Sequence, residues 1–276
     1  VPALAAAWGT WRVALRLCVG PRAALEATAL ACASPVFLVS STNVMSDTML
    51  LAFWVWAVAL WLDGLHDNRP GLLWGAGLLV AAAGLTKYFG FALVPLLAAH
   101  AAWHTRERGG TPTHWGAAAL PLALPILVAV GYEAVTASLY GTGLLFDAGR
   151  FATDWRSQAA PGTAGRILLG PAFAGGCSIS TLLFTPLLWP LRGLALGALA
   201  AAAALIAPEA LLGWTALGEL VQVRLLALQL VLFALGGISL LALIACEARR
   251  SIDAETLLLS LWVVGTLVFA AGLNWT

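Results

Sequence analysis

Charge is what this sequence has least of. Only 10% of its 276 residues are Asp, Glu, Lys or Arg, and 61% are hydrophobic, whereas a soluble domain carries roughly 25% charged residues. Such a chain cannot cover its surface with polar side chains. This excludes an ordinary soluble domain and predicts an integral membrane protein. The formal net charge of +1 gives no support to a nucleic-acid partner.

Motifs for metals, nucleotides and disulfides are also lacking. No Walker loop, dinucleotide fingerprint or G-x-S-x-G elbow occurs, and no cofactor is predicted, although a divalent cation is left open. His100 and His104 have the i,i+4 spacing of metal ligands, but no H-E-x-x-H glutamate accompanies them. We interpret them as an interfacial pair. The four cysteines are widely separated and are interpreted as small packing residues; they are Cys18, Cys32, Cys177 and Cys246.

Long apolar runs are what the chain does contain. They are long enough for helices and lack the alternating pattern of a membrane β-barrel. We predict an all-α, polytopic transmembrane bundle of about ten spans, and interpret residues 1–276 as a single domain truncated at both ends. The predicted spans are 1–19, 23–43, 48–63, 71–86, 89–103, 115–138, 168–190, 193–212, 225–246 and 256–274.

The basic residues orient these spans. If ten spans alternate, one side receives nine arginines and the other receives four arginines and Lys87. Short loops rich in Lys and Arg face the cytoplasm, so the nine-arginine side is predicted to be inside. The "NVMSD" turn, the "TKYFG" turn and the 139–167 loop then face outward. The links on the inner side are interpreted as plain connectors.

Asp47, in "NVMSDTML", is the first candidate for chemistry. A carboxylate at membrane depth is costly, from roughly 2.5 kcal/mol upward at the bilayer centre, so ionisable groups there usually serve a site. The competing interpretation is that Ser46 or Asp47 caps the third span. Both interpretations stay open.

Lys87, in "GLTKYFGFALVP", is the second candidate. It is either a snorkelling lysine beside Tyr88 in an aromatic belt, or a point charge for a phosphate delivered from the membrane. In the second case Gly84 and Gly90 would allow other chain segments to approach closely. The shared outer side of Asp47 and Lys87 favours a functional role.

The 139–167 loop is predicted to contain an amphipathic helix on the outer face. Asp147, Arg150 and Asp154 are spaced three and four residues apart, so they share a helical face. This face is either a solvated, self-paired surface, or Arg150 or Arg156 turns inward to bind an anionic head group. Glu133 is a further ionisable group at membrane depth.

Three stretches carry a family resemblance: "ASPVFLVSSTNVMSDTMLLAFWVWAVALWL", "LLWGAGLLVAAAGLTKYFGFALVPLL" and "FAAGLNWT". They resemble the GT-C membrane glycosyltransferases, in particular the family-39-like group of protein mannosyltransferases and the aminoarabinose transferase of lipid A. The resembling features are an outer aspartate after a proline-containing span, a glycine-rich span ending in a lysine, and the start of a late outer loop.

The resemblance implies a sugar donor on a polyprenyl phosphate, taken from the outer leaflet of a bacterial inner membrane. A glycan, lipid or protein acceptor would attack the anomeric carbon with inversion. In this family the base usually sits in an outer loop before the region where this chain begins. Asp47 therefore carries over as a supporting acid, and Lys87 as a contact to the donor phosphate.

Two other classes compete with a transferase. A transporter or flippase would show repeat halves and interrupted helices with polar groups near the midplane, whereas ionisable residues here gather at the outer rim. The other class is a non-catalytic subunit of a glycan-assembly complex. An outer loop with paired acids before Val1 would exclude this second class.

Overall fold

The computed structural model describes residues 1–43, 45–109, 116, 118–159, 163–209 and 223–272. Within these residues the secondary structure is helical and contains no strand, which confirms the all-α prediction. The chain divides into two compact units, one formed by Val1–Arg150 with Ile252–Leu259 and one by Phe151–Ser251 with Ser260–Thr276.

The first unit begins with α1 (Pro2–Leu17), α2 (Pro21–Cys32), α3 (Pro35–Thr42), α4 (Ser46–His66) and α5 (Pro70–Thr86). Several of these helices start with proline, which suits the first helical position because its missing N–H would have no partner there. A short 3-10 helix, η1 (Tyr88–Ala92), leads into α6 (Leu93–Glu107). Then follow η2 (Leu120–Leu122), α8 (Ala123–Tyr140) and α9 (Leu144–Ala159).

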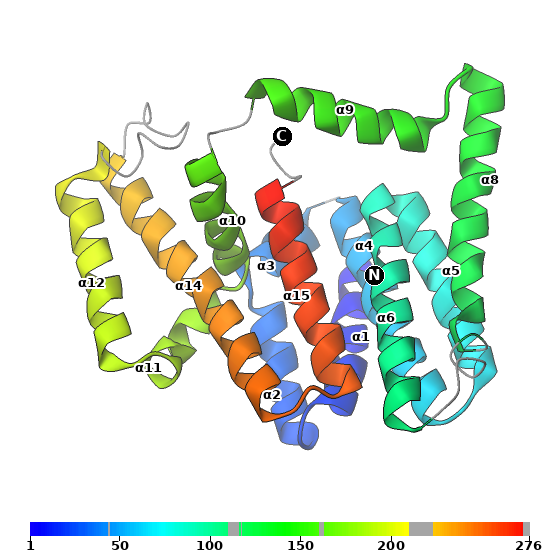
Figure 1. Cartoon of the computed structure of the whole chain (residues 1–276), viewed down its shortest axis with the longest axis horizontal. Helices are drawn as coiled ribbons and strands as arrows, with labels where there is room; N and C mark the ends of the chain where they lie inside the picture. The colour runs from blue at the N-terminus through cyan, green and yellow to red at the C-terminus, as the bar shows by residue number, and fades with distance from the viewer. Residues whose placement is uncertain (44, 110–115, 117, 160–162, 210–222, 273–276) are drawn as a thin grey trace. The chain divides into compact units, whose positions relative to one another are not determined.

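The core of the first unit lies between α1, α4, α5 and α6 (Figure 1). Trp61, Val80 and Leu97 are fully buried there. Small residues bring the helices close: a Cβ on Gly9 of α1 would lie 2.5 Å from Cγ2 of Val55 on α4. Because α4 and α5 are antiparallel and joined by a short link, the start of α4 lies beside the end of α5.

The second unit contains α10 (Thr163–Cys177), η3 (Ile179–Phe184), α11 (Thr185–Leu188), α12 (Leu191–Ile206) and α14 (Val223–Arg250). Helix α15 (Ala254–Gly272) begins in the first unit and continues in the second. The "FAGGC" stretch packs α10 against α14, since a Cβ on Gly175 would meet the carbonyl oxygen of Phe233. All four cysteines are free thiols.

Each of the ten predicted spans falls on helix, but not every helix is long enough to cross a bilayer alone. Within the part of the chain that the structure describes, three helices pass by length and composition: Ser46–His66, Leu120–Tyr140 and Val223–Arg250. Two bent pairs raise this to five if each is one span, namely Pro21–Cys32 with Pro35–Thr42, bent by 64°, and Leu169–Cys177 with Ile179–Leu188, bent by 94°. The full number of ten stays a prediction.

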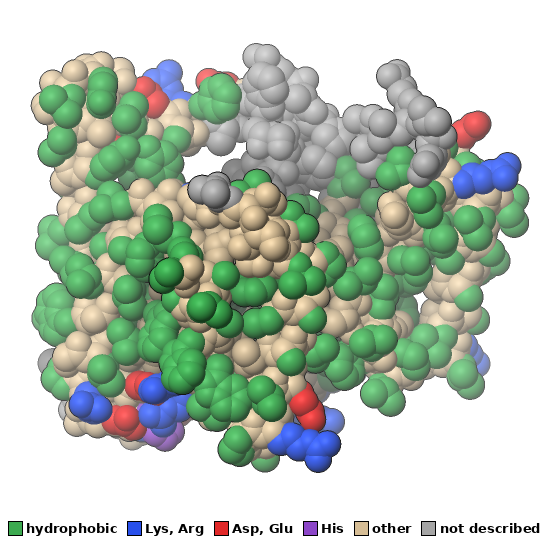
Figure 2. All heavy atoms as spheres, turned by 180° about the vertical axis from the view of Figure 1, so that it is seen from behind, with side chains coloured by type: hydrophobic (Ala, Val, Ile, Leu, Met, Phe, Trp, Pro, Cys, Tyr) green, Lys and Arg blue, Asp and Glu red, His purple; other side chains and the backbone are tan. Residues whose placement is uncertain are grey.

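Charged side chains gather at the ends of the helices. On the face shown in Figure 2, blue, red and purple side chains lie toward the upper and lower edges of the view, and the described surface between them shows mostly hydrophobic side chains, other uncharged side chains and backbone. This is the distribution expected of helices whose middles face hydrocarbon and whose ends reach the headgroup region. The apolar helices thus support an integral membrane protein.

Candidate functional site

Asp47 and Lys87 form an ion pair. Asp47 is the second residue of α4, and Lys87 follows the last residue of α5 in extended conformation. The Lys87 Nζ donates to Asp47 Oδ1 at 2.5 Å. Their side chains are 41% and 48% exposed, so a ligand can still reach both. The antiparallel packing of α4 on α5 brings together two residues that lie 40 positions apart.

The capping interpretation of this turn was wrong. The N-cap of α4 is Met45, which makes no side-chain cap hydrogen bond. Within the described residues, the Ser46 and Asp47 side chains accept no backbone N–H at this helix start. Asp47 still lies in the first turn, where the helix dipole favours a negative charge. Its observed partner is the Lys87 ammonium.

Tyr88 continues the polar edge toward α8. Its hydroxyl lies 3.0 Å from the hydroxyl of Tyr132, and the two rings are tilted with centroids 6.0 Å apart. The hydrogen bond to Tyr132, helped by burial, raises the pKa of Tyr88 to about 12. The Tyr88 hydroxyl therefore remains a neutral hydrogen-bonding group at physiological pH.

The η1 turn that carries Tyr88 is held by close backbone contact. A Cβ on Gly90 would collide with the backbone of Ala83, and a Cβ on Gly84 would collide with the Phe91 ring. This confirms the predicted role of both glycines. Trp54 of α4 donates its indole N–H to the Gly90 carbonyl oxygen at 3.3 Å. Contacts with both α4 and α5 therefore hold the turn that follows Lys87.

Glu133 binds the start of α9. Its carboxylate accepts the backbone N–H groups of Leu145, at 2.9 Å, and Phe146, at 3.4 Å. Thr136 accepts the N–H of Leu144 at 3.2 Å. These donors belong to the first turn of α9, which has no intrahelical partner for them. A carboxylate on α8 therefore caps the next helix, a partner that the sequence did not reveal.

The predicted helix in the 139–167 loop is present as α9. Gly141 ends α8 in the left-handed conformation with φ 78° and turns the chain away from the α8 axis (Figure 1). Arg150 and Asp154 are exposed on α9, and the contacts of Asp47 and Lys87 do not include them. The side chain of Arg156 and the final "LNWT" lie outside the described residues.

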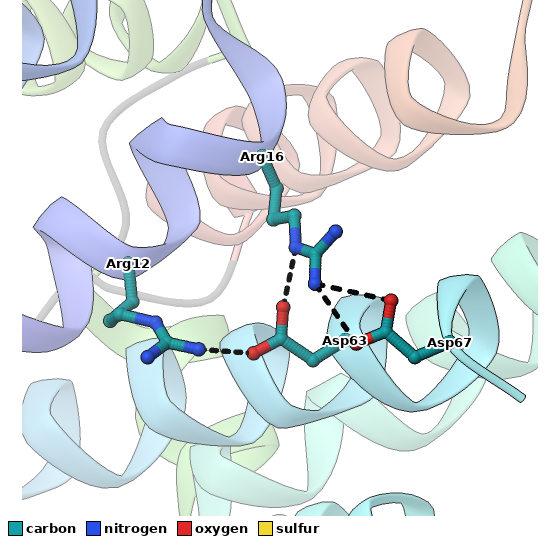
Figure 3. A network of polar contacts seen from close by, with 4 residues as sticks. All are labelled: Arg12, Arg16, Asp63 and Asp67. Atoms are coloured by element: carbon teal, nitrogen blue, oxygen red, sulfur yellow. Dashed lines mark hydrogen bonds and ion pairs between the residues drawn. The ribbon is translucent and has the colours of Figure 1, made fainter. Parts of the chain in front are cut away.

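A second charged cluster occupies the other end of α4, about 24 Å from Asp47 at 1.5 Å per residue. Figure 3 shows Arg12 and Arg16 of α1 both reaching Asp63, with Arg16 also reaching Asp67. The side chain of Asp63 is only 8% exposed. Sequence analysis missed this cluster and treated the neighbouring links as plain connectors. The signal available in the sequence was the i,i+4 spacing of the two arginines on α1 and of the two aspartates at the end of α4.

The histidine pair is buried in the first unit. His100 is only 1% exposed, and its ring stacks on that of His104 with centroids 5.9 Å apart. The interfacial interpretation was therefore wrong for His100, because α6 turns this face toward α4. Among the described residues, no group of three or more His, Cys, Asp or Glu side chains is placed to hold a metal ion.

Taken together, the helices and their charged ends define a helical integral membrane protein with a reachable Asp–Lys pair at one end of its α4–α5 hairpin. Residues 1–132 match the family described as dolichyl-phosphate-mannose-protein mannosyltransferase. This match confirms the resemblance to GT-C membrane glycosyltransferases over a region that contains both Asp47 and Lys87. Neither a curated protein nor a solved structure matches the chain.

Proposed function

We propose that this protein transfers a sugar from a polyprenyl-phosphate-linked donor to a glycan, lipid or protein acceptor at the extracytoplasmic face of a bacterial inner membrane. The observation that carries the proposal is the half-exposed ion pair between Asp47 and Lys87. It lies inside the region that matches the mannosyltransferase family. It also lies at the end of α4 opposite the Arg12–Arg16 cluster, which suits the outer side under the positive-inside rule.

Lys87 is assigned to the donor phosphate. Its ammonium has three N–H donors, and Asp47 takes one of them. Two donors remain for the oxygens of a phosphate that leaves with its charge at the membrane surface. A fixed cation at that position stabilises the charge that develops in the transition state. The tyrosyl hydroxyl of Tyr88, one residue further on, supplies a neutral hydrogen bond to the same bound donor.

Asp47 is assigned to the acceptor side as a supporting acid. Its Oδ1 accepts the Lys87 hydrogen bond, and its Oδ2 is left to accept a hydrogen bond from an incoming hydroxyl. The carboxylate then orients the nucleophile while it holds the lysine in place. The family resemblance places the general base in a different outer loop, so Asp47 is not required to remove the proton itself.

Helix α9 is assigned to the membrane surface and the donor head group. Phe146 and Phe151 are 72% and 62% exposed, and they share α9 with Arg150 and Asp154. A helix with exposed aromatic and charged side chains suits the bilayer interface. Arg150 and Arg156 would then contact the anionic part of the lipid-linked donor from the outer side, and the Asp154 carboxylate would accept hydrogen bonds from its sugar hydroxyls.

The direct test measures transfer from a polyprenyl-phosphate sugar by the full-length enzyme. Lys87→Met is expected to lower turnover by about 100-fold, because it removes a charge that stabilises the leaving phosphate. Asp47→Asn is expected to lower it by a similar order. Asp67→Asn is the matched control: it removes a half-exposed, ion-paired carboxylate from the opposite end of α4 and should leave transfer unchanged.

A charge swap separates chemistry from folding. Asp47→Lys combined with Lys87→Asp can re-form the ion pair, so thermal stability should recover relative to either single change. Transfer should stay low, because the cation no longer stands where the donor phosphate binds. Full recovery of turnover in the swap, or unchanged turnover in Asp47→Asn, would remove the pair from the mechanism.

A transporter remains the second candidate, because the structure contains two bent helix pairs, at 64° and 94°. Interrupted helices are common at transporter sites. Uptake or flipping of the lipid-linked sugar in sealed vesicles, without formation of a glycosylated product, would favour this alternative. Product formation in detergent, where no compartments exist, would exclude transport as the sole activity.

A further inference from the structure

A cavity of about 190 Å³ lies in the first unit, at the end opposite the Asp47–Lys87 pair. It is enclosed by α1, α4, α6 and the start of α15, and its polar lining is Arg16, His66, His100, His104 and Glu255. Its volume is several times the roughly 30 Å³ of a water molecule in the liquid. His104 and Leu65 also line a wider recess of about 690 Å³.

The buried histidine His100 has an unused hydrogen bond donor. Trp61 donates its indole N–H to His100 Nδ1 at 3.1 Å. Since indole nitrogen only donates, Nδ1 must accept, and the ring is neutral with its proton on Nε2. That Nε2 is buried without a hydrogen bond partner among the described residues. An unpaired buried donor is destabilising unless a ligand or water accepts its hydrogen bond.

Further donors share the cavity. The buried Nε2 of His104 also has no partner within the described part of the chain. Arg16 gives Nε and Nη2 to Asp63 and Asp67, and its Nη1 carries no dashed line in Figure 3. The first turn of α15 adds the positive end of a helix dipole. At least two hydrogen-bond donors, His100 Nε2 and the Arg16 guanidinium, therefore belong to the lining.

One group in the lining is a strong acceptor, the carboxylate of Glu255. A fully deprotonated oxyanion such as sulfate would face this carboxylate with no proton to share. Inorganic phosphate keeps at least one proton near neutral pH, and a phosphomonoester, with a second pKa of about 6, can take one up, so both can donate to Glu255 while they accept from His100 and Arg16. This donor–acceptor pattern selects a protonated oxyanion over an aprotic one.

We propose that this cavity binds a phosphate or phosphomonoester group. The site is separate from the proposed sugar transfer, since it lies at the other end of α4. The group could arrive as free phosphate or as the head group of a phosphomonoester lipid, and both would make the same hydrogen bonds. The other occupant of the cavity would be water alone.

The test measures Tm of the purified full-length protein in detergent with inorganic phosphate or sulfate, against chloride at equal ionic strength. We expect a saturable rise in Tm with phosphate and none with sulfate. The same protein in nanodiscs containing phosphatidic acid, a monoester, is compared with nanodiscs containing phosphatidylglycerol, a diester. A rise with free phosphate identifies the soluble source, and a rise only with phosphatidic acid identifies the lipid.

Glu255→Gln provides the sharpest variant, because an amide can donate to an oxyanion. It should admit sulfate, so that sulfate and phosphate then raise Tm similarly. Glu26→Gln, on an exposed carboxylate outside the cavity, should keep the discrimination. His100→Phe should abolish the response by removing the buried donor. The proposal is overturned if no phosphate or monoester lipid shifts Tm, if sulfate acts equally on the unchanged protein, or if Glu255→Gln still rejects sulfate.

Discussion

Asp63 is predicted to be the most important ionisable residue for the stability of the first unit. Its side chain is 8% exposed, and it accepts hydrogen bonds from Arg12 Nη2 and Arg16 Nε, each at 2.5 Å. Asp63→Asn keeps the shape of the side chain but removes its charge. Arg12 would then lose the carboxylate that it contacts, and Arg16 would keep its contact with Asp67 (Figure 3).

The size of the effect follows from burial. A hydrogen bond to a charged group contributes about 1.5–3 kcal/mol, so two such bonds set an upper limit near 6 kcal/mol. The arginine side chains are 44% and 34% exposed, so water will compensate for part of the loss. We expect Asp63→Asn to lower the free energy of unfolding by about 2–3 kcal/mol. Asp67→Asn should cost less than about 1 kcal/mol, because Asp67 is 40% exposed and its bond is longer.

The measurement is unfolding of the detergent-solubilised protein by titration with a denaturing detergent, followed by circular dichroism. Both variants are compared with the unchanged protein under identical conditions. The contrast between them decides the question. Equal losses for Asp63→Asn and Asp67→Asn, or no loss for Asp63→Asn, would refute the argument that burial of Asp63 makes its two bonds strong.

Two further predictions concern the η1 turn and the start of α9. Gly90→Ala places a Cβ against the backbone of Ala83, and backbone cannot move aside as a side chain can. We expect the free energy of unfolding to fall by about 1–3 kcal/mol, measured as a lower Tm. Gly71→Ala has open space within 4 Å and should leave Tm unchanged or slightly higher. Glu133→Ala removes the acceptor for two backbone amides of α9. We expect hydrogen exchange in the first turn of α9 to accelerate and the stability of this helix start to fall by about 0.5–2 kcal/mol. Glu26→Ala is the control and should not change this exchange rate.

Much of the helical organisation followed from the sequence. Apolar runs and the prolines and glycines between them located the helices, since backbone in hydrocarbon must satisfy its own hydrogen bonds. The hairpin of α4 and α5 also followed, because a short link leaves two antiparallel helices no other arrangement. Asp47 and Lys87 were therefore expected on one side, and the structure brings them into direct contact.

Two of the contacts that sequence reasoning missed join residues far apart in the chain. Arg12 and Asp63 are 51 positions apart, and Trp61 and His100 are 39. Such pairs depend on the rotation of each helix about its axis and on the angle at which helices cross. A one-residue shift turns a side chain by about 100°. When almost all faces of a helix are apolar, its local sequence pattern does not indicate how the helix is rotated about its axis.

The sequence by itself determined that this protein is helical and apolar, because composition and run length decide what a bilayer accepts. It also predicted that Asp47 and Lys87 lie on the same side. Only the tertiary structure decided that Asp63 is shared by two arginines, that Glu133 caps α9, and that His100 faces a cavity. These features arise from packing between helices, which follows from their mutual rotation and close approach.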